Sequence, residues 1–444
     1  MKMQPANSLR GRVRVPGDKS ISHRAAMIAA LAEAGGRSRL TNYSTSADCA
    51  STLACLSTLG VRVERTGDDV IDIEGAGVRL AHAPGEVLDC GNSGTTMRLL
   101  AGLLAGQRFA SELTGDASLR TRPMRRIIEP LELMGARISS VDGRAPLRIE
   151  GRAPLAAIRY ASPVASAQVK SCVLLAGLNA EGRTEVCEAR GATRDHTERL
   201  LSLFGADVHT ELKDYEGRLA PVVSLETPAR LHARDCSIAG DISSAAFFAS
   251  AAAMLPGSDV TLASVGLNPT RTGVLEVLHR LGADVVVTDR RTESGEEVGD
   301  VRVRARQDGG LAPAFAGANV LRGELIANLI DELPVLSVLG TQVEGGLEIR
   351  DAAELRVKET DRIGAMVKNL RAMGAEVEEY VDGLSVRGRT QLRGARLESY
   401  DDHRVAMACA VAALLCAGES ELSGADAVAV SFPEFFTLLE SVTK

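Results

Sequence analysis

The stretch LRVKETDRIG, residues 355–364, places five charged side chains within seven positions. It leads into a segment with the i, i+3, i+4, i+7 spacing of a helix that has one buried face, carried by Ile363, Met366, Val367 and Leu370. Thr360 is the predicted N-cap of this helix, and the simplest interpretation is an exposed, charged first turn. If the helical phase extends back to Glu359, however, that carboxylate lies on the apolar stripe. An inward carboxylate needs a partner or a chemical role.

Similar groups of glycine, serine and charged residues precede six apolar segments. They are GDKSISHR at 17–24, CGNSGTTMR at 90–98, ASAQVKS at 165–171, GDISSA at 240–245, IDELP at 330–334 and YDDHR at 400–404. Each group alone is consistent with ordinary capping of a helix. Six helix N-termini that share a region, however, would offer free backbone N–H groups and the positive ends of helix dipoles to anions. The sequence therefore predicts a site for phosphorylated or carboxylated small molecules.

The segments after these entries are alanine-rich and apolar on all sides, which predicts helices buried all round. Five of them are followed within a few residues by a strand-like stretch: SRLTNY, RFASEL, TEVCEA, DVTLAS and GLEIRD. A second series alternates with the first. Five amphipathic helical segments end in a glycine and continue into a strand, at Gly60, Gly135, Gly205, Gly282 and Gly374. The chain is thus predicted to contain six α/β units, with helices inside and sheets outside.

Composition limits the classes of function. The 444 residues suit two or more domains, and the net charge of −7 argues against a general attraction to nucleic acid or acidic membranes. The eight cysteines are scattered, with no CxxC pair and no metal-ligand spacing. We expect a reduced compartment, no signal peptide and no membrane span, and therefore a cytoplasmic protein.

Taken in order and spacing, nine motifs resemble the 5-enolpyruvylshikimate-3-phosphate synthase family. They are PGDKSISHR, CGNSGTTMR, LTGDASLRTRP, SAQVKS, TRDHTE, GDISSA, RVKETDR, DDHR and SFPEFF. The resemblance spans nearly the whole chain and implies two inside-out α/β barrel domains, each of three βαβαββ units, joined by a hinge that closes over the substrates. It places one domain at residues 19–237 and a discontinuous one at residues 1–18 plus 238–444.

The resemblance implies transfer of the enolpyruvyl group of phosphoenolpyruvate to the 5-hydroxyl of shikimate 3-phosphate. Phosphate leaves through a tetrahedral addition intermediate, without a cofactor or a metal. The reaction needs a base, an acid and cations for the phosphates and carboxylates. The implied catalytic residues are Asp331, Glu359 and Lys19. Which carboxylate performs which proton transfer stays open.

The resemblance also implies two sets of ligands. The shikimate 3-phosphate set is Lys19, Ser20, Arg24, Ser166, Ala167, Gln168, Arg194, Asp331 and Lys358. The phosphoenolpyruvate set is Lys19, Asn92, Gly94, Thr95, Arg122, Gln168, Glu359, Arg362, His403 and Arg404. For His403, a role in capping a buried helix is nearly as plausible as a catalytic one. The implied partners are these two small molecules and glyphosate as an inhibitor, and the protein is expected to be a monomer.

Two positions depart from the better-known branch of the family. Val430 stands where that branch has a lysine, and Glu354 where it has an asparagine. We expect Arg125, Arg126 or Arg356 to replace the missing cation. For glyphosate, Gly94 is expected to leave space open for the inhibitor.

Two other functions remain possible. The related transferase that acts on UDP-N-acetylglucosamine carries a cysteine in the loop corresponding to residues 116–122, and this chain has no cysteine between Cys90 and Cys172. A non-catalytic phosphate-binding scaffold would not need charged residues at every helix entry, and an assay of turnover separates it from an enzyme.

Overall fold

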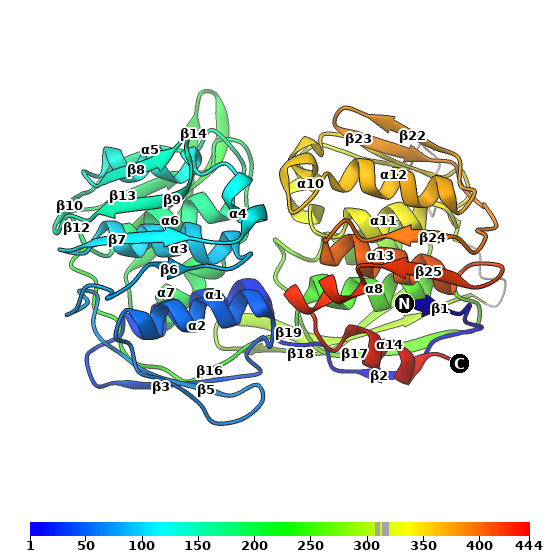
Figure 1. The fold of residues 1–444 in the computed structure, drawn as a ribbon, viewed down its shortest axis with the longest axis horizontal. Helices are drawn as coiled ribbons and strands as arrows, with labels where there is room; N and C mark the ends of the chain where they lie inside the picture. Colours follow the sequence, from blue (N-terminus) through cyan, green and yellow to red (C-terminus); the bar gives the residue numbers. More distant parts are fainter. Residues whose placement is uncertain (307–310, 313–318) are drawn as a thin grey trace. The chain divides into compact units, whose positions relative to one another are not determined.

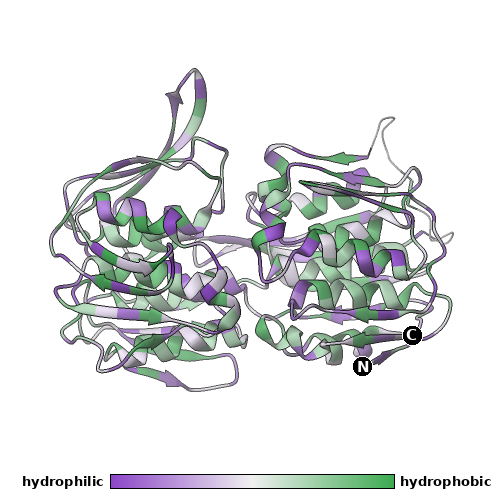
Figure 2. Ribbon diagram, turned by 45° about the horizontal axis from the view of Figure 1, so that its top comes forward, coloured by the Kyte–Doolittle hydropathy of each residue, from purple (hydrophilic) through white to green (hydrophobic). Residues whose placement is uncertain are grey.

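Six buried helices form the interior of the fold, as the alanine-rich segments predict. The computed structural model describes residues 1–306, 311–312 and 319–444. The inner helices are α1 (Lys19–Ala30), α3 (Gly94–Ala105), α6 (Ala167–Gly177), α8 (Ile242–Met254), α11 (Leu333–Gly340) and α13 (His403–Leu414). Every residue of α8, α11 and α13 is buried. Their alanines and glycines let neighbouring helices approach closely, and Figure 2 shows the apolar colouring of these helices.

The chain divides into two compact units. Unit 1 consists of residues 1–16, 239–292 and 297–444, and unit 2 consists of residues 17–238 together with Glu293–Glu296. The predicted boundaries at 18/19 and 237/238 lie within two residues of the main divisions. The short segment 293–296, which the sequence did not indicate, groups with unit 2 although it is the turn of the unit 1 hairpin formed by β18 (Asp284–Glu293) and β19 (Glu296–Arg304), including the last residue of β18 and the first of β19.

Unit 2 surrounds α1, α3 and α6 with three four-stranded sheets (Figure 1). Their strand orders are β16 (Cys236–Ser237), β3 (Arg37–Thr41), β5 (Ile71–Glu74), β4 (Val63–Arg65); β6 (Leu88–Asp89), β7 (Ala110–Thr114), β9 (Arg144–Glu150), β8 (Arg137–Val141); and β11 (Arg159–Ala161), β13 (Thr184–Cys187), β15 (Arg218–Leu225), β14 (Val208–Tyr215). A short pair joins β10 (Leu155–Ala156) and β12 (Ala180–Glu181). The other helices are α2 (Ala47–Thr58), α4 (Ala117–Thr121), α5 (Arg125–Leu133) and α7 (His196–Leu203).

Unit 1 repeats this plan around α8, α11 and α13. Its sheets have the orders β18 (Asp284–Glu293), β19 (Glu296–Arg304), β17 (Asp259–Gly266), β2 (Arg10–Val13); β20 (Val320–Leu321), β21 (Leu347–Ile349), β23 (Gly383–Val386), β22 (Val377–Tyr380); and β1 (Lys2–Met3), β25 (Ser420–Ser423), β24 (Arg396–Glu398). The remaining helices are α9 (Gly273–Arg280), α10 (Glu324–Leu329), α12 (Arg362–Ala372), α14 (Phe435–Val442) and the 3₁₀ turns η1 (Ala353–Val357) and η2 (Ala425–Val430).

The strands before and after several inner helices pair in parallel, which explains why helices and strands alternate along the chain. The strand before α3, β6, pairs in parallel with the strand after it, β7, and the hairpin β8–β9 adds antiparallel strands. The same arrangement recurs around α6 and α11. Parallel strands need a crossover, which the buried helix supplies. The predicted α/β class is therefore confirmed, and the described residues form six main sheets for six predicted units.

The five signature glycines all adopt positive φ angles, between 82° and 98°. Each directly follows the C-cap of an outer helix, α2, α5, α7, α9 or α12, before a strand begins. A left-handed residue ends a helix at low cost only when it lacks Cβ. The predicted order of helix, glycine and strand is confirmed.

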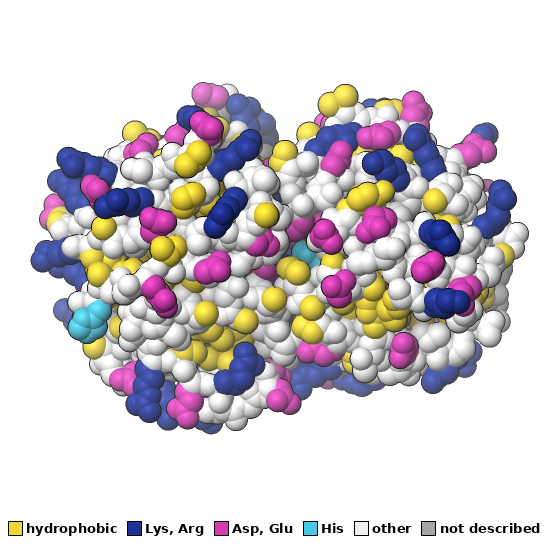
Figure 3. Space-filling model, viewed as in Figure 1, with side chains coloured by type: hydrophobic (Ala, Val, Ile, Leu, Met, Phe, Trp, Pro, Cys, Tyr) yellow, Lys and Arg dark blue, Asp and Glu magenta, His cyan; other side chains and the backbone are white. Residues whose placement is uncertain are grey.

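The surface carries charges of both signs. On the face shown in Figure 3, Lys and Arg side chains are interspersed with Asp and Glu, and no single sign dominates. Within the described residues, no helix is long and apolar enough to cross a membrane.

Candidate active site

In unit 2 the first turns of α1, α3 and α6 lie together. Gln168 of α6 donates from Nε2 to Thr95 Oγ1 of α3 at 2.9 Å, and Arg24 of α1 donates from Nη2 to Ser171 Oγ of α6 at 3.0 Å. Each helix begins with a side-chain cap, in which Asp18, Ser93 and Ser166 accept a bond from a first-turn backbone N–H. The predicted grouping of helix N-termini is present within this unit. We call the candidate residues here the α1/α3/α6 cluster: Lys19, Ser20, Arg24, Asn92, Gly94, Thr95, Arg122, Ser166, Ala167, Gln168 and Arg194.

Neutral oxygens hold most arginines of the α1/α3/α6 cluster. Arg24 is buried and donates from Nε to Thr197 Oγ1 at 2.8 Å. Arg122, also buried, donates from Nη2 to Asn92 Oδ1 at 2.7 Å. Arg194 donates from Nη1 to Ser20 Oγ at 3.3 Å. Each of these hydrogen bonds fixes the direction of a guanidinium group.

Lys19 differs, because its Nζ contacts Asp48 Oδ2 at 2.8 Å. Asp48 lies in the first turn of α2 and is buried. No sequence motif pointed to Asp48. Its location in the segment SADC, just after the strand that follows α1, carried no charge pattern that would have distinguished it.

The expectation that Gly94 leaves open space is wrong. A Cβ atom at this position would lie 2.7 Å from Nη1 of Arg98 and 3.5 Å from Nη1 of Arg122. Arg98, one turn further along α3, is buried and donates from Nη1 to Gln168 Oε1 at 2.7 Å. Gly94 therefore makes room for a fixed arginine that the sequence analysis overlooked.

In unit 1, Arg362 is the centre of a second group. It is fully buried, and three carboxylates surround it: Asp402 at 2.8 Å from Nε, Glu359 at 2.6 Å from Nη2 and Asp331 at 3.6 Å from Nη1. Burial lowers the pKa of Arg362, but the attraction of Asp402, Glu359 and Asp331 outweighs burial, so that the net change is upward. We call this group the α11/α12/α13 cluster: Asp331, Lys358, Glu359, Arg362, His403 and Arg404.

Asp331 also lies beside Arg404. Arg404 approaches Oδ1 of Asp331 with Nε at 3.4 Å and donates from Nη1 to the backbone carbonyl of Asp331 at 3.1 Å. Lys358 lies 3.5 Å from Glu354. Burial lowers the pKa of Lys358, and the nearby Glu354 and Asp331 only partly oppose this effect. Glu354, one of the two departures from the better-known branch, thus pairs with a candidate ligand.

The predicted start of α12 is wrong. Asp361, not Thr360, caps the helix, and it accepts a hydrogen bond from the N–H of Gly364 at 3.0 Å. Glu359 therefore precedes the helix instead of continuing its apolar stripe. The carboxylate is nevertheless directed inward, because Arg362, three residues later, binds it. The conclusion that Glu359 has a partner was correct, but the geometry behind it was not.

Arg356 does not have the free guanidinium that a replacement ligand would need. It donates to Asp361 at 2.6 Å, to Glu379 at 3.0 Å and to the carbonyl of Val381 at 2.8 Å. These bonds tie the 3₁₀ turn η1 to the hairpin β22–β23. The suggestion that Arg356 replaces the cation missing at Val430 is not supported by these contacts.

His403 and Asp402 begin α13. His403 is buried as the first residue of the helix, and Asp402 caps the helix by accepting bonds from the N–H groups of Arg404 and Val405 at 2.8 and 3.2 Å. Asp402 is also the carboxylate closest to Nε of Arg362. The motif YDDHR contained this residue, but the sequence gave no means of choosing between its two aspartates.

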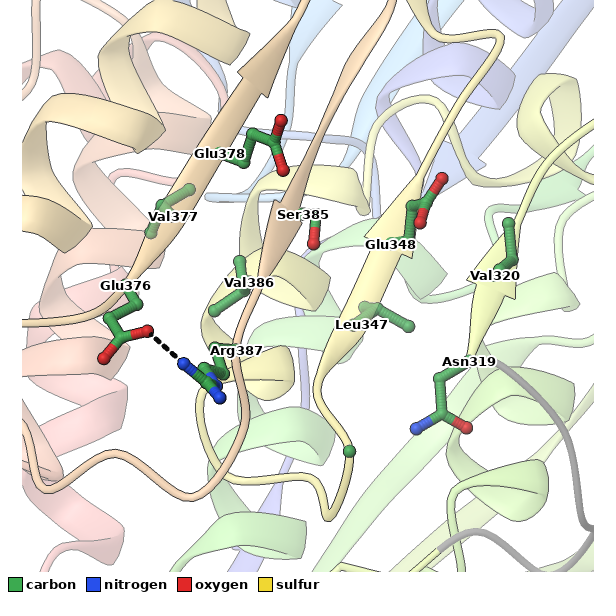
Figure 4. Close-up of a pocket in the computed structure, with 11 residues that line it drawn as sticks. Asn319, Val320, Leu347, Glu348, Glu376, Val377, Glu378, Ser385, Val386 and Arg387 are labelled. Atoms are coloured by element: carbon green, nitrogen blue, oxygen red, sulfur yellow. Dashed lines mark hydrogen bonds and ion pairs between the residues drawn. The ribbon is translucent and has the colours of Figure 1, made fainter.

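A separate hollow lies on a sheet of unit 1. Figure 4 shows it along β20, β21, β23 and β22, lined by Glu348, Glu378, Ser385 and other side chains, with an ion pair between Glu376 and Arg387. None of the candidate residues lines it. Over the residues that the structure describes, no group of three or more His, Cys, Asp or Glu side chains is arranged to hold a metal ion.

Comparison with known proteins decides the family. Residues 3–439 match the family model described as EPSP synthase (3-phosphoshikimate 1-carboxyvinyltransferase). The chain belongs to the EPSP synthase family.

Relatives agree with this assignment over their full lengths. The 3-phosphoshikimate 1-carboxyvinyltransferase of Koribacter versatilis is 51% identical, with 100% of this chain and 99% of the relative covered. That of Salinibacter ruber is 50% identical, with coverage of 99% and 98%. The solved structure of EPSP synthase from Acinetobacter baumannii has a TM-score of 0.85 and 40% identity, covering 100% and 98% of the two chains. The enolpyruvyl transferase NikO from Streptomyces tendae, at 17% identity and a TM-score of 0.76, shares the fold over 99% and 96% of the chains.

Proposed function

We infer that this chain is the transferase that moves the carboxyvinyl (enolpyruvyl) group of phosphoenolpyruvate to the 5-hydroxyl of shikimate 3-phosphate and releases phosphate. This is a step of the shikimate pathway toward chorismate and the aromatic amino acids. The observation that carries the inference is the match to the EPSP synthase family over residues 3–439. The two charged clusters supply the groups that such a reaction needs.

We propose that the α1/α3/α6 cluster binds mainly the anionic groups of both substrates. Its arginines carry positive charge, and a planar guanidinium binds phosphate or carboxylate with two parallel hydrogen bonds. Ser20, Arg24, Ser166, Ala167, Gln168 and Arg194 are the proposed ligands of shikimate 3-phosphate. Asn92, Gly94, Thr95, Arg122 and Gln168 are the proposed ligands of phosphoenolpyruvate, and Lys19 is proposed to contact both substrates and to take part in catalysis.

We propose that the α11/α12/α13 cluster performs the proton transfers. In the addition step the 5-hydroxyl oxygen bonds to C2 of phosphoenolpyruvate, its proton passes to a base, and an acid gives a proton to the methylene carbon C3. In the elimination step the bond from C2 to the phosphate oxygen breaks and the new methyl group loses a proton. For the addition step, Glu359 is the proposed acid that protonates C3 and Asp331 the proposed base that takes the hydroxyl proton. Lys358 is a proposed shikimate 3-phosphate ligand, and Arg362, His403 and Arg404 are proposed phosphoenolpyruvate ligands.

The contact between Glu359 and Arg362 suggests how Glu359 gains the proton that an acid must donate. An incoming carboxylate or phosphate that binds Arg362 competes with Glu359 for the same Nη2 hydrogen. A carboxylate that loses a cationic partner and gains an anionic neighbour binds a proton more strongly. Binding of phosphoenolpyruvate would then favour the protonated form of Glu359, which the addition step needs.

A direct assay tests the proposed function. Purified protein is incubated with shikimate 3-phosphate and phosphoenolpyruvate, and phosphate release is followed, with reactions lacking either substrate as controls. We expect release only with both substrates. A protein that binds both compounds but never turns them over would instead fit a binding scaffold, and turnover with UDP-N-acetylglucosamine would fit the related transferase.

Several further expectations remain proposals. We propose that units 1 and 2 are the two domains of the family fold, and that the protein acts as a monomer in the cytoplasm without a cofactor. We also propose that glyphosate inhibits it in competition with phosphoenolpyruvate.

A further inference from the structure

Lys170, Glu188 and Glu198 form a buried ionic cluster that has no role in the reaction as described above. Lys170 Nζ lies 2.7 Å from Glu198 Oε1 and 3.0 Å from Glu188 Oε2. The side chains of Lys170, Glu188 and Glu198 are 2%, 6% and 7% exposed, respectively. The three residues come from different places in unit 2: the first turn of α6, the residue directly after β13 and the first turn of α7.

The cluster contacts a connecting segment that forms neither a helix nor a strand. Residues 191–195 connect the turn after β13 to α7. Within this segment, the backbone N–H of Thr193 donates to Glu188 Oε1 at 2.9 Å, and the Thr193 hydroxyl donates to the same oxygen. Lys170 Nζ also lies 3.4 Å from the carbonyl oxygen of Thr193. Both polar groups of the Thr193 backbone therefore contact the ionic cluster.

The residue after Thr193 is Arg194, a proposed ligand of shikimate 3-phosphate. Arg194 donates to Ser20 Oγ at 3.3 Å, so its guanidinium lies at the first turn of α1. Glu198 and Thr197 fix the other end of the segment, because Glu198 binds Lys170 and Thr197 binds Arg24. Lys170 itself follows the proposed ligand Gln168 by two residues. The ionic cluster thus connects two regions that carry proposed ligands.

Stability alone does not explain these buried charges. Burial of an ion pair costs several kcal/mol per ion, and apolar residues of similar volume often serve the fold as well or better. Burial lowers the pKa of Lys170, but attraction by Glu198 and Glu188 outweighs it and raises the pKa overall. Lys170 therefore stays charged, and its charge is directed at the backbone of the segment that carries Arg194.

We propose that Lys170, Glu188 and Glu198 position Arg194 for binding shikimate 3-phosphate, with Lys170 and Glu188 acting through Thr193. The inference rests on the proposed function and on the proposed role of Arg194. Lys170, Glu188 and Glu198 are positioning residues and need not touch the substrate. A fixed guanidinium loses less conformational freedom when it binds phosphate, so the cluster would raise affinity without contributing a contact of its own.

A double-mutant cycle tests the proposal. Binding of shikimate 3-phosphate alone is measured by calorimetry for the wild type, Lys170→Met, Arg194→Ala and the double variant, and turnover is measured with both substrates. We expect Lys170→Met to weaken shikimate 3-phosphate binding by about fivefold or more and to change the KM for phosphoenolpyruvate by less than about twofold. In the double variant we expect an affinity close to that of Arg194→Ala, because the two residues act through one interaction.

Lys213→Met is the matched control. Lys213 also pairs with two carboxylates in unit 2, Glu211 and Glu185, at 2.7 and 3.2 Å, but it is half-buried and lies on β14. These two carboxylate partners lie on β14 and β13, not on the segment that carries Arg194. We expect this variant to bind like the wild type. If Lys170→Met does not fold, Glu188→Gln replaces it in the double-mutant cycle with Arg194→Ala. This substitution keeps the side-chain shape and removes the charge that binds Thr193.

The outcomes are distinct. Unchanged affinity in Lys170→Met, or effects of Lys170→Met and Arg194→Ala that add fully, would overturn the positioning role. Wild-type affinity in Arg194→Ala would overturn it as well, while the proposed function would stand as long as the wild type turns over both substrates. Absence of turnover in the wild type would overturn the proposed function itself, and this inference with it.

Discussion

The two candidate clusters hold their cations in different ways. In the α1/α3/α6 cluster, hydroxyl and amide oxygens hold Arg24 and Arg122. In the α11/α12/α13 cluster, three carboxylates surround Arg362, and Asp331 is shared with Arg404. The bonds of Arg24 and Arg122 to hydroxyl and amide oxygens fix the two guanidinium groups, whereas the carboxylates around Arg362 are groups that can exchange protons. The difference suggests that unit 2 contributes mainly binding and unit 1 mainly acid–base chemistry.

Within the α1/α3/α6 cluster, Lys19 pairs with a carboxylate, that of Asp48. This pair brings into the cluster the mixed charge that is also found around Arg362. It agrees with the proposal that Lys19 contacts both substrates and takes part in catalysis.

The largest expected effect comes from the carboxylates of unit 1. Glu359→Gln and Asp331→Asn should each lower kcat by roughly 10²-fold or more, because positioned acids and bases contribute about 10²- to 10⁴-fold. The midpoint of thermal unfolding should change little, since Asp402 remains to pair with Arg362. Glu376→Gln, at an exposed ion pair of the same unit, is the control. Near-normal turnover in either variant would remove that residue from the proton transfers.

The second largest effect is expected on phosphoenolpyruvate binding, when Arg122 of unit 2 is replaced. Arg122→Ala should raise the KM for phosphoenolpyruvate by roughly 10- to 100-fold and lower kcat much less, because hydrogen bonds to charged groups are worth about 1.5–3 kcal/mol. Arg120→Ala, two residues earlier on the surface of α4, should behave like the wild type. Steady-state kinetics with each substrate varied in turn measure both constants. A loss confined to kcat would contradict the comparison between the two clusters.

A smaller effect is expected at Gly94. Its added methyl group in Gly94→Ala would lie 2.7 Å from Arg98 Nη1, so the arginine that holds Gln168 must move. The atom that must shift is the end of a flexible side chain, so the shift costs less than the ~1–3 kcal/mol typical of overpacking a rigid core. We expect glyphosate inhibition to weaken by about tenfold or more, with a smaller rise in the KM for phosphoenolpyruvate.

Gly85→Ala provides the control for this substitution, because no atom lies within 4 Å of a Cβ built there. Inhibition constants measured at several phosphoenolpyruvate concentrations test the prediction. A wild type that millimolar glyphosate does not inhibit, or an alanine variant as sensitive as the wild type, would show that Gly94 does not control access of the inhibitor.

The smallest effect concerns pH. Because burial lowers the pKa of Lys358, this ammonium group loses its charge at a lower pH than an ordinary lysine. Affinity for the anionic shikimate 3-phosphate should therefore fall a few-fold as the pH rises through this lowered pKa. Lys358→Arg should remove that part of the decline, since an arginine stays charged throughout the range. The KM for shikimate 3-phosphate measured between about pH 7 and 10 tests this, and identical profiles for both proteins would contradict it.

The sequence predicted the elements of the fold because their signals are local. Capping residues, alanine-rich helices and glycines after outer helices each act within one or two turns of the chain, and they identified six inner and five outer helices. The entries to the inner helices therefore also marked where charged side chains gather. The family motifs predicted the candidate residues themselves, and their proposed roles await the experiments above.

Only the tertiary structure decided which charges meet. Strand β2 near the start of the chain pairs with β17, about 250 residues later, and Arg362 pairs with Asp402, 40 residues away. Asp48, Arg98 and the Lys170 cluster likewise acquire their partners only when separate helices pack together. Local sequence sets the phase of a helix and the residue that caps it, whereas the electrostatic partner of a buried charge depends on packing between distant segments, which no local pattern contains.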